Sequence, residues 1–137
     1  MSFSNASGKI ELIRYATDIN CVISGMFSKL LKQSIISFKF DGNIISFSDN
    51  RISSGRLYLN SGFDYITELS AGYCYTDNYN RRFNRQGFMK SKIIKKYNLD
   101  ITDASLKTEW ELMQDLGFDR LWDCGKKKWS IHTSKFT

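Results

Sequence analysis

Hydrophobic and polar residues alternate with two different periods along the first half of the chain. Between residues 27 and 38, apolar side chains recur every three or four positions, which predicts an amphipathic helix. Residues 44–48 are instead rich in β-branched and aromatic side chains, which favours a strand. Asp41, Gly42 and Asn43 separate the two segments and form a turn signal. The pattern therefore indicates helices and strands that follow each other closely.

The remaining elements are predicted from the same kinds of pattern. Thr108, followed three residues later by Glu111, forms a capping box, which predicts the start of a helix that Gly117 ends. Residues 77–86 read as a polar, arginine-rich loop. Further helices are expected at 9–19, 55–60, 87–97 and 108–116, and further strands at 21–23, 63–69, 73–76, 120–123 and 128–132.

The order of these elements predicts the fold class. Strands alternate with helices in the first half, which favours a partly parallel sheet, and the last two strands read as a C-terminal hairpin across 124–127. We therefore expect an α/β to α+β fold, with a mixed sheet and flanking helices. No linker divides the sequence, so 1–137 is expected to be a single domain in which residues 1–8 are a short polar leader.

Composition narrows the classes of protein to which the chain can belong. Its 137 residues carry a formal net charge of +6, which favours attraction to nucleic acid or to another acidic partner. No apolar run approaches the roughly 20 residues that span a bilayer, and the first residues lack the features of a secretory signal. A cytoplasmic protein without membrane contact is expected. Cys21, Cys74 and Cys124 are scattered among apolar residues and are expected to be buried free thiols.

Two blocks in the first half have the pattern of a cofactor site. In SGMFSKLLK, Gly25 stands at a strand-to-helix turn, where backbone amides and a helix N-terminus can approach an anion. A glycine that only turns the chain is the alternative. One strand later comes RLYLNSGF, which contains Tyr58. In order and separation the two blocks resemble the cofactor-binding half of GNAT-type acyltransferases. The resemblance implies that Tyr58 protonates the leaving thiolate of acetyl-coenzyme A, and that the coenzyme lies on Gly25, Met26, Phe27, Ser28 and Lys29.

A wider resemblance covers the chain from Glu11 to Gly125. ELIRYAT, IISFSDN, YCYTDN and TEWELMQDLGFDRLWDCG, together with the two blocks, are similar to a GNAT-like domain of bacteriophage proteins that is often attached to homing-endonuclease modules. This resemblance implies a truncated GNAT-like sheet and a place in the host cytoplasm. The chain departs from the pattern at Met26, where a second glycine is common, and before residue 9, where the elements of the acceptor side are not found. Both departures weigh against acyl transfer.

Basic and aromatic residues are concentrated in one third of the chain. Arginine and lysine neutralise phosphates and aromatic rings stack on bases, so this segment is a candidate nucleic-acid surface. A solvated loop followed by a solvated helix face is the alternative. A second contact is expected at Lys126 and Lys127, in a turn beside Trp122 and Trp129. The candidate contacts in the main segment are Arg81, Arg82, Arg85, Lys90, Lys92, Lys95 and Lys96.

These observations lead to three hypotheses of function. The first is a nucleic-acid-binding module without catalysis, acting on DNA as a regulator or as a defence or counter-defence factor, with no metal or cofactor. A homodimer would suit such a regulator, because two subunits match two half-sites. The second hypothesis is an N-acyltransferase that uses acetyl-coenzyme A. The third is an inhibitor that binds an acidic surface of a host or phage protein.

Overall fold

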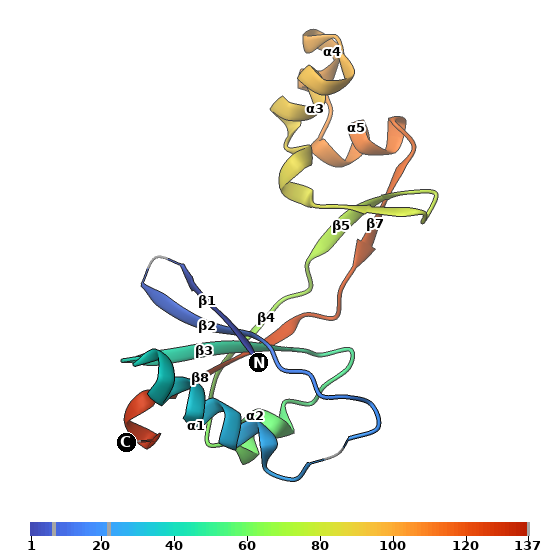
Figure 1. The fold of residues 1–137 in the computed structure, drawn as a ribbon. Helices are drawn as coiled ribbons and strands as arrows, with labels where there is room; N and C mark the ends of the chain where they lie inside the picture. Colours follow the sequence, from blue (N-terminus) through green and yellow to red (C-terminus); the bar gives the residue numbers. More distant parts are fainter. Residues whose placement is uncertain (7, 22, 137) are drawn as a thin grey trace. The chain divides into compact units, whose positions relative to one another are not determined.

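The chain forms two compact units in the computed structural model, which describes residues 1–6, 8–21 and 23–136 (Figure 1). The first unit comprises Met1–Ser70 and Cys124–Thr137, and the second unit comprises Ala71–Asp123. The second unit is therefore inserted into the first, whereas the sequence indicated one domain. The sequence shows no linker at the boundaries of the second unit, because only three residues (70–72 and 123–125) connect the strands on either side of each boundary. The described residues form five α-helices and eight strands in two sheets, an α+β fold.

A five-stranded mixed sheet forms the centre of the first unit. In sheet order its strands are β1 (Ser2–Ala6), β2 (Lys9–Arg14), β3 (Asn43–Asp49), β8 (Lys126–His132) and β4 (Asp64–Leu69). The helices of this unit are α1 (Met26–Phe38), α2 (Arg56–Asn60) and the 3-10 helix η2 (Thr133–Phe136). β2 and β3 are parallel and α1 lies between them in the chain, which confirms the expected partly parallel sheet. The other neighbours in the sheet are antiparallel.

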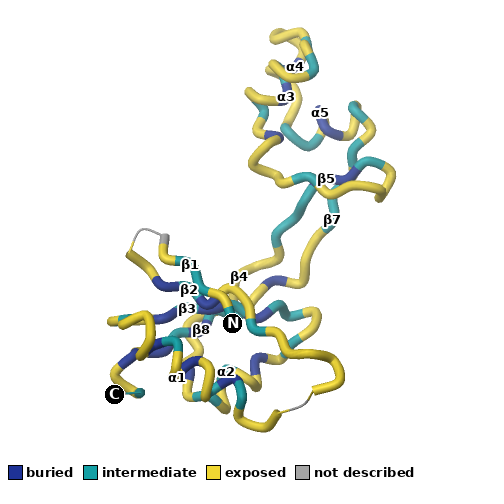
Figure 2. The backbone as a smooth tube through the Cα atoms, in the orientation of Figure 1, coloured by how far each residue is buried: buried dark blue, intermediate teal, exposed yellow. Residues whose placement is uncertain are grey.

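The core of the first unit lies between α1 and one face of this sheet. Alternate residues of β3 are buried, namely Ile44, Ser46 and Ser48 (Figure 2). On α1 the buried residues recur at helical spacing instead, as the sequence predicted. The buried members of this core are Ile10, Leu12, Phe27, Leu31, Ile35, Ile44, Phe63, Trp129 and Ile131.

The start of the chain differs from the expectation. Residues 9–14, expected to be helical, form β2, and the expected leader contains β1. Ile10 and Ile13 have helical spacing, but Ile10 and Leu12 are the buried pair and Ile13 is exposed, so the true period is two. β2 is stabilised by pairing with β1 and β3, which a local pattern does not reveal. Of the expected strand at 21–23, Cys21 and Ile23 lie in no strand, and residue 22 lies outside the described residues.

The second unit packs helices against a three-stranded antiparallel sheet. In sheet order its strands are β6 (Arg81–Phe83), β5 (Tyr73–Asp77) and β7 (Phe118–Trp122). Its helices are η1 (Arg85–Phe88), α3 (Lys90–Tyr97), α4 (Ile101–Leu106) and α5 (Glu109–Asp115). Thr108 and Glu111 form the predicted capping box at the start of α5. The buried core residues are Tyr75, Phe88, Ile93, Ala104, Leu112 and Met113.

Several expectations for the second half are wrong. The C-terminal hairpin does not form, because β7 pairs with β5 in the second unit, while β8 pairs with β3 and β4 in the first. Alternation identifies a strand but not its partner. The arginine-rich loop contains β6, and α4 was not expected. The cysteines are free, but Cys21 and Cys124 are exposed and Cys74 is half-buried, so the prediction of buried thiols fails.

Candidate nucleic-acid interface

Charge is strongly segregated along the second unit. Residues 71–98 contain seven basic side chains and one acidic side chain, whereas residues 99–123 contain seven acidic and two basic ones. The basic stretch forms β5, β6, η1 and α3, and the acidic stretch forms α4, α5 and β7. Phosphate is therefore attracted to the first group of elements and repelled from the second.

The two arginines of β6 point to opposite faces of the three-stranded sheet. Phe83 lies opposite Tyr75 and packs in the core against the helices. Because side chains alternate along a strand, Arg82 points to the other face, where it lies opposite the buried Thr76. The side chain of Arg81 points to the same face as Phe83, on the side of the helices. The two neighbouring arginines therefore do not belong to one phosphate-binding surface, which separates two of the predicted contacts.

Three basic side chains do gather on one surface, around η1. Arg85 belongs to η1 itself. From α3, the Lys92 Nζ donates a hydrogen bond to the carbonyl of Gln86 (3.0 Å), and the Lys96 Nζ lies 4.7 Å from the ring centroid of Phe88. Both lysines lie on one side of α3, because they are four residues apart. All three cations are exposed, and we call Arg85, Lys92 and Lys96 the basic face.

The other predicted lysines lie elsewhere. Lys90 points toward α4, where its Nζ donates to the carbonyl of Ser105 (2.9 Å). Lys95 is exposed and directly precedes Lys96, so it points to a different side of α3. Lys126 and Lys127 lie in β8 of the first unit rather than in a turn, directly opposite Asp49 and Glu68 respectively. These acidic cross-strand neighbours reduce the local positive potential at the two lysines.

Arg120 has a central position that the sequence did not indicate. Its guanidinium lies 4.2 Å from the ring centroid of Tyr73 and 4.4 Å from that of Trp110. It also donates a hydrogen bond to the Tyr75 hydroxyl (3.4 Å). The Tyr75 hydroxyl donates in turn to Oε1 of Glu109 (2.7 Å), to which the Tyr73 hydroxyl also donates (3.4 Å). These five residues, the Arg120 network, come from β5, α5 and β7, so no local spacing could have revealed them.

The Arg120 network fixes the orientation of the Glu109 side chain. Burial raises the pKa of Tyr75 above its ordinary value, the hydrogen bond from Arg120 acts in the opposite direction, and the bond to Glu109 raises the pKa again. The Tyr75 hydroxyl therefore remains a donor at physiological pH. Its hydrogen bond occupies one oxygen of Glu109 and orients the carboxylate.

An open cavity of about 630 Å³ adjoins this network. Tyr73 and Glu109 line it from the network, and Arg85 lines it from the basic face. The Arg85 guanidinium lies 4.9 Å from the ring centroid of Tyr73, on which it rests as a cation–π pair. The basic face and the Arg120 network therefore meet at this cavity.

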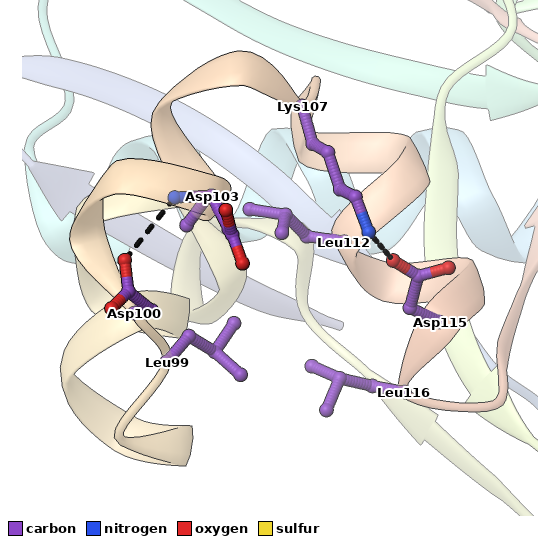
Figure 3. Close-up of a pocket in the computed structure, with 8 residues that line it drawn as sticks. Leu99, Asp100, Asp103, Lys107, Leu112, Asp115 and Leu116 are labelled. Atoms are coloured by element: carbon purple, nitrogen blue, oxygen red, sulfur yellow. Dashed lines mark hydrogen bonds and ion pairs between the residues drawn. The ribbon is translucent and has the colours of Figure 1, made fainter.

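A smaller cavity between α4 and α5 has the opposite electrostatic character. It measures about 270 Å³, and Asp100, Asp103 and Asp115 line it together with three leucines (Figure 3). Lys107, which also lines it, forms an ion pair with Asp115 (2.6 Å). Hydrogen bonds from the backbone amides of Asp103 and Thr102 lower the pKa of Asp100, whose carboxylate caps α4. This acidic cavity is unsuited to phosphate.

The two blocks of the expected coenzyme site lie in contact within the first unit. The ring centroid of Phe27 lies 6.0 Å from that of Tyr58, and the Ser28 hydroxyl donates to the Ser61 hydroxyl (3.2 Å). Gly25 begins α1 with a left-handed φ of 70°. Met26 is half-buried and Lys29 is exposed, so Phe27 is the residue of the first block that belongs to the core.

The Tyr58 hydroxyl belongs to an internal chain of hydrogen bonds. The Ser46 hydroxyl donates to the carbonyl of Leu12 (2.8 Å), so the Tyr58 hydroxyl donates to Ser46 Oγ (2.9 Å), and the carbonyl of Phe47 is a second, longer acceptor (3.4 Å). The Tyr58 ring also stacks on Trp129, with centroids 5.7 Å apart. Tyr58 thus links α2 to β3, and its proton is held inside the fold.

Substitution of Tyr58 by phenylalanine should lower the free energy of unfolding by about 1 kcal/mol, because Ser46 loses its donor while the ring packing remains. Urea denaturation measures the change. Tyr65→Phe is the matched control, since Tyr65 also packs against Trp129 but is 50% exposed. It should change the stability by less than about 0.5 kcal/mol. Equal stability of the two variants would contradict the structural role of the Tyr58 hydroxyl.

Comparison with known proteins gives no match, whether with family models, with curated proteins or with solved structures. Among the described residues, no helix has the length and apolar character needed to cross a bilayer.

Proposed function

We propose that this chain is a nucleic-acid-binding module that works without catalysis, and that the basic face of the second unit contacts the phosphate backbone of DNA. The observation that supports this most is the gathering of Arg85, Lys92 and Lys96 around η1. Cations that neutralise phosphates release condensed counterions, which favours binding. A DNA-binding regulator and a defence or counter-defence factor both require such a contact.

The local contacts of the basic face also favour binding. Lys92 and Lys96 are already held against η1, so their side chains lose less conformational freedom when a phosphate arrives. The net charge of +6 adds long-range attraction that raises the association rate at low salt.

Titration of a labelled DNA duplex at several salt concentrations tests the proposal. The association constant should fall steeply with salt, and Arg85→Ala should reduce the slope of log K against log salt by about one. Arg82→Ala is the matched control, because this arginine points to the opposite face of the sheet. Its slope should stay close to that of the unmodified protein. Binding that does not depend on salt would contradict the proposal, as would equal slopes for the two variants.

An acidic protein surface would use the same cations. Capture from a host lysate with and without nuclease treatment separates the two kinds of partner. Capture that nuclease abolishes supports DNA, whereas capture of a protein that survives nuclease supports an inhibitor.

Acyl transfer from acetyl-coenzyme A is a second candidate, because the two blocks of the expected site are in contact in the first unit. The first turn of α1 carries no acidic residue, and a side chain built on Gly25 meets no atom within 4 Å, so this end of the helix is open to a phosphate. Tyr58 fits less well, since it already donates its proton to Ser46. Calorimetric titration with acetyl-coenzyme A tests the candidate, and the absence of both heat and a thermal shift would end it.

A further inference from the structure

We propose that the cavity beside the basic face holds an unpaired base of a single-stranded nucleic acid and favours bases that carry an exocyclic amino group. The inference rests on the proposed function, since phosphates on the basic face would bring the strand to the cavity. At about 630 Å³ the cavity lies within the range of volumes that enclose small organic ligands.

Arg85 connects the phosphate contacts with the cavity. It is exposed on the basic face and also lines the cavity, where its guanidinium lies on the ring of Tyr73. A planar guanidinium supported by a ring is a platform on which an unpaired base stacks. A strand that binds the basic face therefore has a stacking surface for its next base.

The polar groups around the platform match the edge of a base. The Asn84 Oδ1 accepts a hydrogen bond from the Gln86 amide (2.9 Å), which leaves the Asn84 side-chain NH2 as a donor. Glu109 uses Oε1 to accept from Tyr73 and Tyr75, and within the described parts of the chain nothing donates to its Oε2. A free carboxylate oxygen accepts from the amino groups of cytosine, adenine or guanine, whereas the N3–H of thymine lies between two carbonyl oxygens that repel a carboxylate.

Glu109 also determines which part of the nucleic acid enters. Its negative charge repels a phosphate, so the backbone stays on the basic face while the neutral base enters the cavity. In a duplex the pairing edges of the bases are already occupied. The cavity therefore selects single strands.

Fluorescence anisotropy with labelled decamers of deoxycytidine and of thymidine tests the inference. The protein should bind the cytosine strand about tenfold more tightly than the thymine strand, because one amino group gains the Glu109 acceptor. Glu109→Gln retains an oxygen that accepts from Tyr75 but replaces Oε2 by an NH2 donor. This variant should lose the preference for cytosine or reverse it toward thymine. Ribonucleotide decamers of the same bases show whether the sugar contributes.

A second variant tests the platform without changing the charge. Arg85→Lys keeps the cation and so the salt dependence, but removes the planar guanidinium. Its affinity for the cytosine decamer should fall by about tenfold at an unchanged salt slope. Equal binding of cytosine and thymine strands by the unmodified protein would overturn the inference, as would an unchanged preference in Glu109→Gln. In both cases salt-dependent duplex binding would leave the proposed function standing. Failure to bind any strand or duplex would instead overturn the proposed function itself.

Discussion

Replacement of Gly55 by alanine is expected to lower the free energy of unfolding by about 3 kcal/mol, through strain in the backbone and overpacking of the core. Gly55 has a left-handed φ of 84°, and a Cβ built on it would overlap the ring of Trp129. That ring is 2% exposed, stacks on Tyr58 and donates from Nε1 to the Ser48 hydroxyl (2.8 Å). These contacts hold the ring in its present position, so moving it away from a new Cβ would disrupt them.

Gly25→Ala separates the two causes of this loss. Gly25 has a similar left-handed φ of 70°, but a Cβ built there meets no atom within 4 Å. Only the backbone strain applies, so the cost should be about 1 kcal/mol. Denaturant unfolding of both variants provides the comparison. Equal losses would show that the close approach of Gly55 to Trp129 is not part of the fold.

Replacement of Arg120 by methionine is expected to destabilise the second unit by about 2 kcal/mol, because a partly desolvated cation between aromatic rings is lost together with its hydrogen bond. Methionine keeps most of the apolar stem, so the loss of stability measures the contribution of the guanidinium group. The contacts removed are those with Tyr73, Trp110 and the Tyr75 hydroxyl. Without Arg120, the carboxylate of Glu109 also loses the nearest cation of its network.

The matched control for this change is Arg81→Met, in which an exposed arginine of the same unit is removed. Its stability should stay within about 0.5 kcal/mol of the unmodified protein. Trp110 lies in the Arg120 network whereas Trp129 belongs to the first unit, so the resolved NMR signal of the Trp110 indole N–H during urea unfolding follows the second unit. If both variants unfold at the same urea concentration as the unmodified protein, the network contributes nothing to stability.

Elements with local signals could be predicted from the sequence. α1 follows from the spacing of Phe27, Leu31 and Ile35, and the start of α5 follows from the capping box of Thr108 and Glu111. The errors concern elements whose identity depends on distant partners. β2 is a strand because it pairs with β1 and β3, and residues 120–122 belong to the second unit because β7 pairs with β5.

In the candidate site, too, only the features with a local sequence signal could be predicted. The dense charge between residues 81 and 96 can be recognised from the sequence alone, because it requires no knowledge of the fold. The sequence did not show that Arg82 points away from Arg85, nor that Lys126 and Lys127 lie in the other unit opposite acidic residues. Glu109 and Arg120 become candidates only through contacts with β5.

If the basic face binds nucleic acid, as we propose, a triple variant of that face should show a much weaker dependence of binding on salt. Neutralisation of Arg85, Lys92 and Lys96 by glutamine should reduce the slope of log K against log salt by about three. Neutralisation of Arg82, Lys126 and Lys127 removes the same net charge from positions outside the basic face, and should leave most of the slope in place. Equal reductions in the two triple variants would show that binding follows net charge rather than the basic face, and would overturn the proposed function.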